Sequence, residues 1–368
     1  MLVTTHEPCC RSIPLSKTRE RTTLEYPHVR PVIIGSGLIA ESHAKALRDL
    51  GTSPAVVWSP NPSNRERFAA RWGATAAATL QEALDVPGVS HAHICTTPMN
   101  HNDAIREAAE RGMTVISEKP LAPTALLAAE ALHHVTANDV PNFLNFNRRQ
   151  DEGIQVLRDL LAEGEIGSPV SVFGHYRQQW NASPSGLDWR YDPSQVGPTR
   201  TVVEIGSHWL DLAHFVLGAE ITEANATLGY MGERDYEVAG EKGRVTPPND
   251  DFFMAMLKFE NGVIGQVYGT ELSHGSFDEI ELRVDGTTGS AVWTSAHPNQ
   301  LRIGNKVTGL RTIGWDSDGD SLSRSISAIY TDKAKEKGVA TFADGLANAR
   351  ALDAIHLSAA SRTWKETR

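Results

Sequence analysis

The chain contains 368 residues, of which 40% are hydrophobic and 22% are charged, and this composition excludes a collagen-like, disulfide-rich or mainly disordered protein. Its 35 basic and 45 acidic side chains give a formal net charge of −10, which argues against nucleic acid or an anionic membrane as the main partner. A chain of this length corresponds to about two domains.

The three cysteines, Cys9, Cys10 and Cys95, include no pair at metal-ligand spacing, so we expect neither a metal site nor a disulfide framework. Free thiols are typical of a reducing compartment. No stretch of about 18 apolar residues predicts a transmembrane helix, and the N-terminus lacks the apolar segment of a signal peptide. The sequence therefore predicts a cytoplasmic protein without a membrane partner.

Residues 1–28 show no apolar periodicity, and we expect a flexible N-terminal arm there. From residue 29 onward, apolar runs alternate with helical patterns. The expected strands lie at 32–34, 55–58, 92–95, 114–116 and 143–146, and the expected helices at 38–50, 65–72, 103–110 and 124–137. Steady alternation of strand and helix indicates a parallel sheet with helices on both faces. Residues 29–147 are therefore predicted to form a doubly wound α/β domain.

Residues 148–368 show a different pattern, in which a helix at 154–161 precedes segments of alternating hydrophobicity. The expected strands lie at 170–178, 252–259, 263–272, 279–284 and 291–294, with a hairpin signal at Asn261-Gly262. The segments 183–200 and 238–250 are predicted loops, and 344–361 is a predicted closing helix that can pack back on the first domain. This half is expected to be an α/β domain with an open, mostly antiparallel sheet.

A glycine-rich turn joins the first expected strand to the first expected helix. Its sequence, Gly35-Ser36-Gly37-Leu38-Ile39-Ala40, has the GxGxxA form of a dinucleotide-binding Rossmann fold, in the strand–turn–helix context that this motif requires. Gly35 permits the tight turn, Gly37 lets a pyrophosphate approach the backbone, and Ala40 allows close packing of the helix. The free N–H groups at the start of the helix then favour an anion.

The residue that selects between NAD and NADP is expected at the end of the second strand, where an acid binds the ribose 2′-hydroxyl of NAD. Ser59 stands at that place, and a hydroxyl does not repel a 2′-phosphate as a carboxylate does. Asn61, Asn64 and Arg65 follow closely and can supply hydrogen-bond donors. The sequence favours NADP slightly over NAD, and both stay open.

Three further motifs follow along the chain. Thr97-Pro98-Met99-Asn100-His101 comes after the third strand and Glu118-Lys119-Pro120 after the fourth, and Glu204-Ile205-Gly206-Ser207-His208-Trp209-Leu210-Asp211 lies in the second half. Together with the fingerprint, over residues 29–362, they make the chain similar to the Gfo/Idh/MocA family of sugar and cyclitol oxidoreductases. Glu204 stands where the family usually has Asp, and Gly197-Pro198-Thr199-Arg200-Thr201 replaces the family's glycine-rich approach to this motif.

The resemblance implies an N-terminal Rossmann domain and a C-terminal α/β domain that binds the substrate, with an open sheet that forms a homodimer or homotetramer. It implies catalytic roles for Lys119, between nicotinamide and substrate, for His208 as acid and base, and for Glu204 as a substrate-binding carboxylate. The expected cofactor-binding residues are Gly35, Ser36, Gly37, Leu38, Ile39, Ser59, Asn61, Asn64, Arg65, Thr96, Thr97, Pro98, Asn100, His101, Glu118 and Lys119.

These side chains suit the oxidation of an alcohol. An imidazole such as that of His208 exchanges protons near its reference pKa of about 6.5, and the Lys119 ammonium can stabilise a developing alkoxide. If Glu204 lies in the first turn of a helix, then Glu204, His208 and Asp211 share one helix face; the alternative is a solvated helix face.

Other residues add weaker candidates. Arg148, Trp189, Arg190 and Tyr191 are candidate substrate-binding residues, since aromatic rings and guanidinium groups bind sugars well, and a structural role is equally open for each.

The sequence predicts an NAD(P)-dependent oxidoreductase that acts on a secondary hydroxyl or ketone of a small sugar, cyclitol or sugar derivative. Two alternatives remain at this stage. One is a glycoside hydrolase that retains NAD and uses a transient oxidation, and the other is a cofactor-binding regulatory protein without catalysis.

Overall fold

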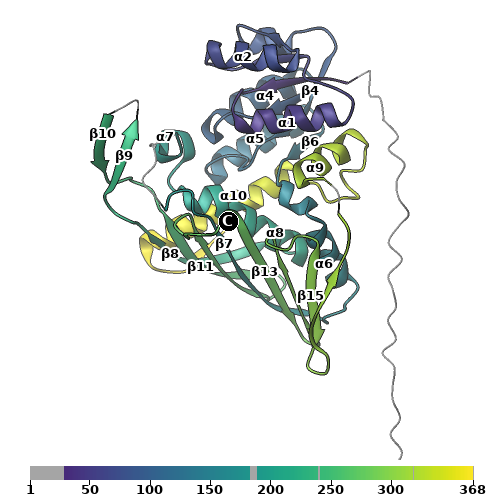
Figure 1. The fold of residues 1–368 in the computed structure, drawn as a ribbon, viewed down its shortest axis with the longest axis vertical. Coiled ribbons are helices and arrows are strands. Elements are labelled where there is room, and N and C mark those ends of the chain that lie inside the picture. Colours follow the sequence, from purple (N-terminus) through teal and green to yellow (C-terminus); the bar gives the residue numbers. More distant parts are fainter. Residues whose placement is uncertain (1–28, 183–188, 239–240, 318, 368) are drawn as a thin grey trace, which may run out of the picture.

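The computed structural model describes residues 29–182, 189–238, 241–317 and 319–367, and the expected arm at 1–28 lies outside them. Two sheets organise the described chain (Figure 1). The first is fully parallel, with the order β3-β2-β1-β4-β5-β6. Its strands are β1 (Arg30–Ile34), β2 (Val56–Trp58), β3 (Thr75–Ala76), β4 (Val89–Ile94), β5 (Thr114–Ser117) and β6 (Asn142–Leu144). This sheet confirms the predicted doubly wound fold.

Helices cover both faces of the parallel sheet. They are α1 (Leu38–Asp49), α2 (Pro62–Trp72), α3 (Leu80–Leu84), α4 (His101–Glu110) and α5 (Ala125–Ala137). Side-chain caps fix where several of them begin: Thr124, for example, accepts a hydrogen bond from the backbone N–H of Leu127 at the start of α5. β1 is buried on both faces from residue 31 to residue 34, which explains its continuous apolar sequence.

The second sheet is mixed, with the order β16-β15-β14-β13-β7-β12-β11-β8-β17. Its β7–β12 pair is parallel and its other pairs are antiparallel, as predicted for an open, mostly antiparallel sheet. The strands are β7 (Pro169–Arg177), β8 (Ile221–Gly229), β11 (Phe252–Phe259), β12 (Ile264–Thr270), β13 (Glu279–Gly286), β14 (Ser290–Thr294), β15 (Gln300–Asn305), β16 (Gly309–Gly314) and β17 (Lys365–Glu366).

A separate hairpin of β9 (Arg234–Val238) and β10 (Glu241–Val245) projects beside this sheet (Figure 1). It corrects the prediction that 238–250 is a loop, because β10 pairs antiparallel with β9 along its whole length. The helices of this half are α6 (Glu152–Ala162), α7 (Pro193–Val196), α8 (Ser207–Leu217), α9 (Ser321–Tyr330) and α10 (Phe342–Ser361).

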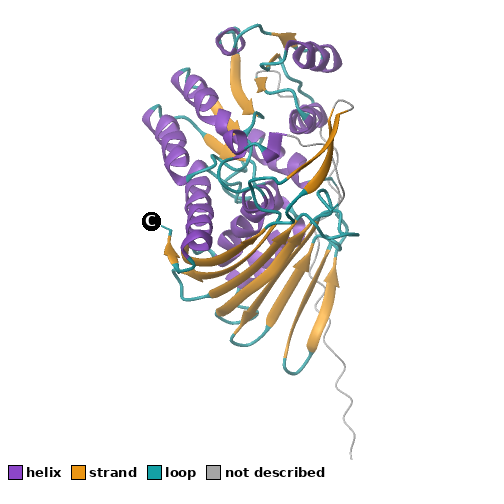
Figure 2. Ribbon diagram, turned by 90° about the vertical axis from the view of Figure 1, so that its left-hand side faces the viewer, coloured by secondary structure: helices purple, strands orange, loops and turns teal. Residues whose placement is uncertain are grey.

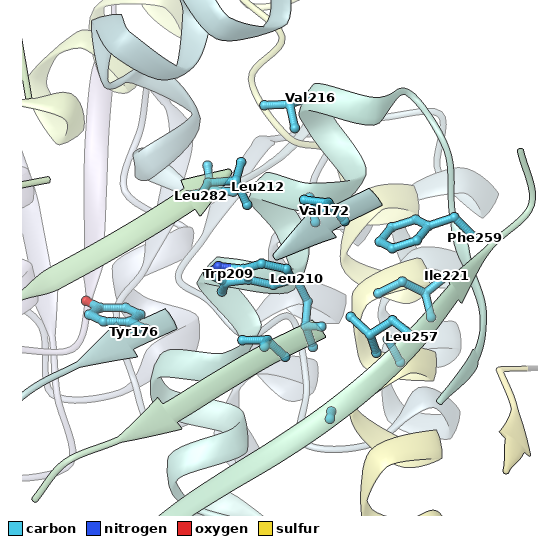
Figure 3. Packing of buried hydrophobic residues seen from close by; sticks show 14 of the residues in the cluster. Val172, Tyr176, Trp209, Leu210, Leu212, Val216, Ile221, Leu257, Phe259 and Leu282 are labelled. Atoms are coloured by element: carbon cyan, nitrogen blue, oxygen red, sulfur yellow. The ribbon is translucent and has the colours of Figure 1, made fainter. Parts of the chain in front are cut away.

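Helices cover one face of the nine-stranded sheet and leave the other open (Figure 2). The covered face holds a core in which Trp209 of α8 packs among Val172, Leu282 and Leu257 (Figure 3). Trp209 is fully buried, and its indole N–H donates to the carbonyl of Glu281 at 2.9 Å. Truncation of a buried tryptophan costs about 3–5 kcal/mol, so α8 is held firmly on the sheet.

Two helices of the second half also pack on the first. α10 lies against α5 and against β8, and Phe342 and Ala349 belong to the core of the parallel sheet. α9 packs against α1 through Leu322 and Ile326. The parallel sheet is therefore stabilised by α9 and α10, which begin 177 and 198 residues after the end of β6. No helix in the described ranges is long and apolar enough to cross a membrane.

Candidate functional site

The turn after β1 requires glycine at its first position. Gly35 has φ +113°, and a Cβ added there would lie 2.4 Å from the carbonyl oxygen of Cys95. Its N–H donates to the carbonyl of Trp58 at 2.7 Å, which ties the turn to β2. A side chain at this position would meet fixed backbone, so Gly35 serves the fold of the turn.

The start of α1 is open. A Cβ added at Gly37 would meet no atom within 4 Å, although Gly37 is the N-cap residue of α1 and its backbone is extended. Among the described residues, no side chain caps this helix end, and Leu38 is 90% exposed. The N-terminal N–H groups of α1 are therefore available to a ligand, and the helix dipole favours an anion there. This arrangement fits the pyrophosphate of a dinucleotide.

The end of β2 forms the second part of the expected cofactor site. Ser36 and Ser59 are joined by a hydrogen bond between their hydroxyl groups at 2.9 Å. Arg65 donates to the carbonyl oxygens of Ser59 and Ala78, while its buried Nε has no hydrogen-bond partner in the described chain. Asn61 caps α2 by accepting from the N–H of Asn64 at 3.0 Å. The Asn64 side chain accepts from Arg67.

The segment after β4 contains one hydroxyl group without a hydrogen-bond partner among the described residues and several side chains that are held by hydrogen bonds. The buried hydroxyl of Thr96 has no hydrogen-bond partner among the described residues, which suits a group that meets a cofactor. Thr97 donates to Gln195 of α7 at 2.9 Å and accepts from Asn100 at 2.7 Å, so α7 lies over this segment. Pro98 is buried.

His101 corrects an expectation. It is fully buried, and its two ring nitrogens face the carbonyl oxygens of Leu121 and Thr96, each at 3.1 Å. Burial lowers the pKa of the imidazole, and the neutral ring donates its one N–H to one of these two oxygens. With no exposed surface, His101 lies in the core and not at the surface where a cofactor would bind.

Glu118 and Lys119 follow β5 at the carboxyl edge of the parallel sheet, where ligands bind in such folds. The Glu118 carboxylate is almost fully buried and accepts from His43 at 2.9 Å, from Asn145 and from the backbone N–H of Lys119. Burial favours the neutral acid, but His43, Asn145 and Lys119 outweigh it and lower the pKa of Glu118. Glu118 is therefore a fixed carboxylate at the base of Lys119.

Lys119 and Glu204 meet across the two halves of the chain. Lys119 Nζ donates to the backbone carbonyl of Glu204 at 3.0 Å and lies 3.6 Å from its Oε2. Arg190 Nε approaches the same oxygen at 3.4 Å. Burial would raise the pKa of Glu204, but the charges of Lys119 and Arg190 outweigh burial and lower it. The site thus contains an ionised carboxylate clamped between two cations.

Glu204 lies in a π-helical turn (Val202–Gly206) directly before α8, not in a regular helical turn. Such turns often occur at functional sites because they redirect a side chain. The extra residue per turn changes the phase of the helix, so the predicted common face of Glu204, His208 and Asp211 is only partly formed. Asp211 points instead to Arg149, which it holds through two hydrogen bonds at 2.6 and 2.9 Å in the core.

His208 is in α8, with its imidazole edge-on to the rings of Phe146 and Tyr176. Its buried Nδ1 has no hydrogen-bond partner among the described residues. Burial, and then the charges of Lys119 and Arg148, lower the pKa of His208 well below its ordinary value. The imidazole is therefore neutral with a free nitrogen, which is the form that accepts a proton.

A cluster that the sequence did not predict lies beside His208. Asp278 accepts hydrogen bonds from Arg148, from the Tyr176 hydroxyl and from Gln178 at 3.2 Å. Arg148 also lies 3.5 Å from Asp151, and it was the one member predicted from the sequence. Tyr176 and Gln178 sit at the end of β7, and Asp278 directly precedes β13; no motif marks these positions.

The three predicted substrate residues of the loop before α7 lie at different depths. Trp189 is 36% exposed, and the guanidinium of Arg190 stacks on its ring at 4.4 Å, which leaves this pair at the surface of the site. Tyr191 is buried beneath it, where its hydroxyl donates to Asn181 at 2.6 Å and accepts from Arg234 at 2.7 Å. The structure gives Tyr191 the role of an anchor for its loop.

Family comparisons agree with this geometry. Residues 29–146 match the family described as "Oxidoreductase family, NAD-binding Rossmann fold", and residues 154–292 match the "GFO/IDH/MocA C-terminal domain". The first match ends just after β6 and the second begins within α6, so the two matches meet between the two sheets.

Named relatives match between about seven tenths and nine tenths of this chain. Levoglucosan dehydrogenase of Pseudarthrobacter phenanthrenivorans is 28% identical over 90% of this chain and 96% of that protein. The scyllo-inositol 2-dehydrogenase (NAD(+)) of Bacillus subtilis is 28% identical over 71% of this chain and 72% of that protein. D-apiose dehydrogenase of Rhizobium rhizogenes is 25% identical over 90% and 96%.

Solved structures show the same fold. Levoglucosan dehydrogenase in complex with NADH and L-sorbose superposes with a TM-score of 0.83 at 27% identity, over 92% of this chain and 99% of that chain. An oxidoreductase domain protein from Kribbella flavida gives a TM-score of 0.82 at 25% identity, over 93% and 99%.

Proposed function

The chain belongs to the Gfo/Idh/MocA family of oxidoreductases, and we propose that it transfers a hydride between a bound nicotinamide dinucleotide and a secondary hydroxyl or ketone group of an uncharged sugar, cyclitol or related polyol. The observation that carries the proposal is the meeting of Lys119 and Glu204, 3.6 Å apart, at the carboxyl edge of the parallel sheet. Relatives named as dehydrogenases of levoglucosan, scyllo-inositol and D-apiose support the substrate class.

The side chains supply what the hydride transfer needs. When bound, the nicotinamide provides the hydride acceptor that no side chain can replace. In the oxidation, the C–H electron pair leaves with the hydride, the O–H proton passes to the neutral imidazole of His208, and a C=O bond forms. Lys119 holds the substrate oxygen by a charge-assisted hydrogen bond, and Glu204 keeps the ammonium of Lys119 in place. Reduction of a ketone runs these steps backward.

The charge balance of the site favours an uncharged substrate. Lys119 and Arg190 share the carboxylate of Glu204, and Arg148 pairs with Asp278 and Asp151. The three cations therefore face three carboxylates, and none of the three stands without a partner to hold a phosphate or a carboxylate of the substrate. We expect turnover of neutral polyols and little turnover of sugar phosphates or sugar acids at equal concentration.

We propose that the cofactor site accepts NADP as well as NAD, since Ser59 offers a hydroxyl and Arg65 a cation where a 2′-phosphate would lie. The family is NAD-binding, so NADH is the reference. Ser59→Asp should lower kcat/KM with NADPH by roughly 10- to 100-fold, because its carboxylate repels the 2′-phosphate. This ratio corresponds to about 1.4–2.7 kcal/mol. The kcat/KM with NADH should stay within about threefold of the wild-type value. A wild-type protein without activity on NADPH would refute this part of the proposal.

We also propose that the open face of the nine-stranded sheet joins copies of the chain into a dimer or tetramer. It exposes Phe173, Met254, Met256 and Ile264 on neighbouring strands, with exposed fractions of 37–54%. Contiguous apolar side chains on a sheet face of this kind are typical of a protein–protein interface. Size-exclusion chromatography with light scattering tests this directly.

The decisive experiment is a panel of polyols and ketosugars with both cofactors, followed by nicotinamide absorbance, on the wild type, Lys119→Met and His208→Asn. Each variant should lose roughly 10²- to 10³-fold in kcat, as is usual when a general base or an electrostatic group is removed, while NADH affinity stays within about threefold. Lys306→Met, at an exposed position away from the site, is the matched control. Wild-type rates in either site variant would refute the assigned roles, and turnover without net absorbance change would instead favour a glycosidase.

A further inference from the structure

Four titratable side chains form a buried hydrogen-bonded array behind Lys119. Glu118 lies 2.9 Å from Nε2 of His43, and Nδ1 of His43 lies 2.9 Å from Nδ1 of His93. Nε2 of His93 lies 2.8 Å from the hydroxyl of Tyr330. His43 comes from α1, His93 from β4 and Tyr330 from the end of α9, and none of the four residues is more than 6% exposed.

With Glu118 ionised and His93 uncharged, as the lowered pKa values of both groups favour, the array admits two consistent arrangements of hydrogen bonds. With both imidazoles neutral, Tyr330 donates to His93, His93 donates to His43, and His43 donates to Glu118. With one further proton on His43, this residue donates to both Glu118 and His93, and the N–H of His93 then donates to the tyrosine oxygen. In either arrangement, the hydroxyl of Tyr330 completes the hydrogen bonding of His93.

The surrounding charges favour the protonated arrangement. Burial opposes a charge on His43, but Cys95 and Glu118 beside it outweigh burial and raise its pKa to about 10. Burial, with the charges of His43 and His91, lowers the pKa of His93. The ring of His91 lies 4.9 Å from that of Tyr330, and the charge of Asp332 raises the pKa of His91 against the effect of burial. At the other end of the array, Asn145 and Lys119 face Glu118.

Stability alone does not explain a charged pair in this core. Replacing a buried ion pair with apolar side chains of similar volume is often neutral or stabilising. Here the pair ends at the carboxylate that accepts the N–H of Lys119, and the same lysine donates through Nζ to Glu204. The opposite end of α9 supports the segment of Arg148: Ser321 accepts from Asn147 at 3.0 Å, and Arg324 donates to the carbonyl of Gln150 at 2.7 Å.

We propose that the Glu118–His43–His93–Tyr330 array positions Lys119 for the reaction, with Tyr330 as its remote positioning residue and α9 as the common support of Lys119 and Arg148. The inference rests on the proposed function. The array acts by keeping the Glu118 carboxylate ionised and oriented beneath Lys119, so that the ammonium stays directed at Glu204 and at the substrate oxygen.

The first test compares Tyr330→Phe with Ile329→Val, a variant in the same helix that loses one buried methylene and leaves the array intact. Both should lose stability by a similar small amount, seen as a lower urea midpoint of unfolding. Only Tyr330→Phe should lower kcat, by roughly five- to tenfold at unchanged KM for the cofactor, the ratio expected for about 1–1.4 kcal/mol of positioning. Equal kcat values in the two variants would overturn the proposal.

The second test uses replacement at His43. In His43→Gln the side-chain amide can still donate to Glu118, whereas His43→Leu cannot. We expect kcat within about threefold of wild type for Gln and at least tenfold lower for Leu, with Glu118 left as an uncompensated buried charge. The same rate for both variants would show that the hydrogen bond to Glu118 has no role.

The third measurement is independent of turnover. In the ligand-free protein, ¹⁵N NMR of the imidazoles and of Lys119 Nζ should show a changed His93 tautomer and a displaced Lys119 Nζ resonance in Tyr330→Phe, and neither change in Ile329→Val. If the wild type oxidises no polyol but these signals change, the proposed function fails and the array stands. If the signals do not change, the array fails whatever the enzyme's activity.

Discussion

The two glycines of the first turn make a sharp test of the cofactor site, because the same substitution should have opposite effects at the two positions. At Gly37, an added methyl group meets nothing within 4 Å, and its φ of −83° is open to any residue. Gly37→Ala should therefore cost the fold less than about 1.5 kcal/mol, mostly from a poorer N-cap. At Gly35, φ is +113° and the methyl group would lie 2.4 Å from a backbone oxygen. Strain and overpacking together should cost roughly 2–6 kcal/mol.

Cofactor affinity should show the reverse ranking. The methyl group of Gly37→Ala occupies the open space above the start of α1, where a pyrophosphate would approach the N–H groups. Loss of one charge-assisted hydrogen bond costs about 1.5–3 kcal/mol, so the Kd for NADH should rise roughly 10- to 150-fold. Thermal and urea unfolding measure the first effect, and the fluorescence of the protein's eight tryptophans measures NADH binding. Wild-type affinity in Gly37→Ala, or a severe stability loss in that variant alone, would refute this assignment of the two glycines.

Three further changes test other parts of the molecule. Burial lowers the pKa of His214 to about 4, and its Nε2 accepts a hydrogen bond from the N–H of Ile221 at 3.1 Å. Between pH 6.5 and pH 4 the native state therefore binds fewer protons than the unfolded chain. The free energy of unfolding should fall by at most about 3 kcal/mol as the pH drops through this range. Denaturant unfolding at pH 5 and pH 8 should show a smaller difference in His214→Gln, and an unchanged difference would contradict the assignment. Met254→Glu on the open sheet face should shift light scattering toward the monomer without loss of secondary structure. Arg200→Met should destabilise the protein by about 3–5 kcal/mol, because the fully buried guanidinium pairs with Glu271 and with Asp251, and its loss leaves the buried Glu271 carboxylate uncompensated while Asp251 keeps Arg234.

The parallel sheet was predictable because its determinants are local. β1 is apolar along its whole buried length, the turn after it needs glycine, and threonine or asparagine marks the starts of several helices. Each of these signals lies within a few residues of the structure it determines. The predicted strands and helices of residues 29–147 accordingly coincide with β1, β2 and β4–β6 and with α1, α2, α4 and α5.

The elements that the sequence did not predict have weak local patterns. β8, with the sequence ITEANATLG, is rich in alanine and threonine and alternates poorly, yet it pairs with β11 on one side and β17 on the other. α9 begins with SLSRS, a composition typical of loops, and is held by packing of Leu322 and Ile326 on α1. In both cases tertiary contacts override a weak intrinsic preference.

The candidate site shows the same division between local and long-range determinants. The prediction that Lys119, Glu204 and His208 share one site came from the resemblance to a family. Their spacing alone could not predict it, because 85 residues separate the lysine from the glutamate. The π-helical turn at Val202–Gly206 was invisible in the sequence because its cause is the packing around it: Asp250 accepts from the backbone N–H groups of Arg200 and Val202, and Thr201 donates to the Asp250 carbonyl. That turn moves Glu204 out of phase with Asp211.

The two buried histidines of the array, His43 and His93, need hydrogen-bond partners that lie far away in the sequence. A histidine in α1 and another in β4 look like ordinary members of an amphipathic helix and a buried strand. Each carries two ring nitrogens, however, and a buried nitrogen without a partner costs about 1–3 kcal/mol. The partners come from residues 118 and 330, which are 75 and 237 positions away from the two histidines. The hydrogen bonds of the two histidines therefore connect the parallel-sheet half, Lys119 and α9 in one chain of contacts, which hydrophobic periodicity cannot reveal.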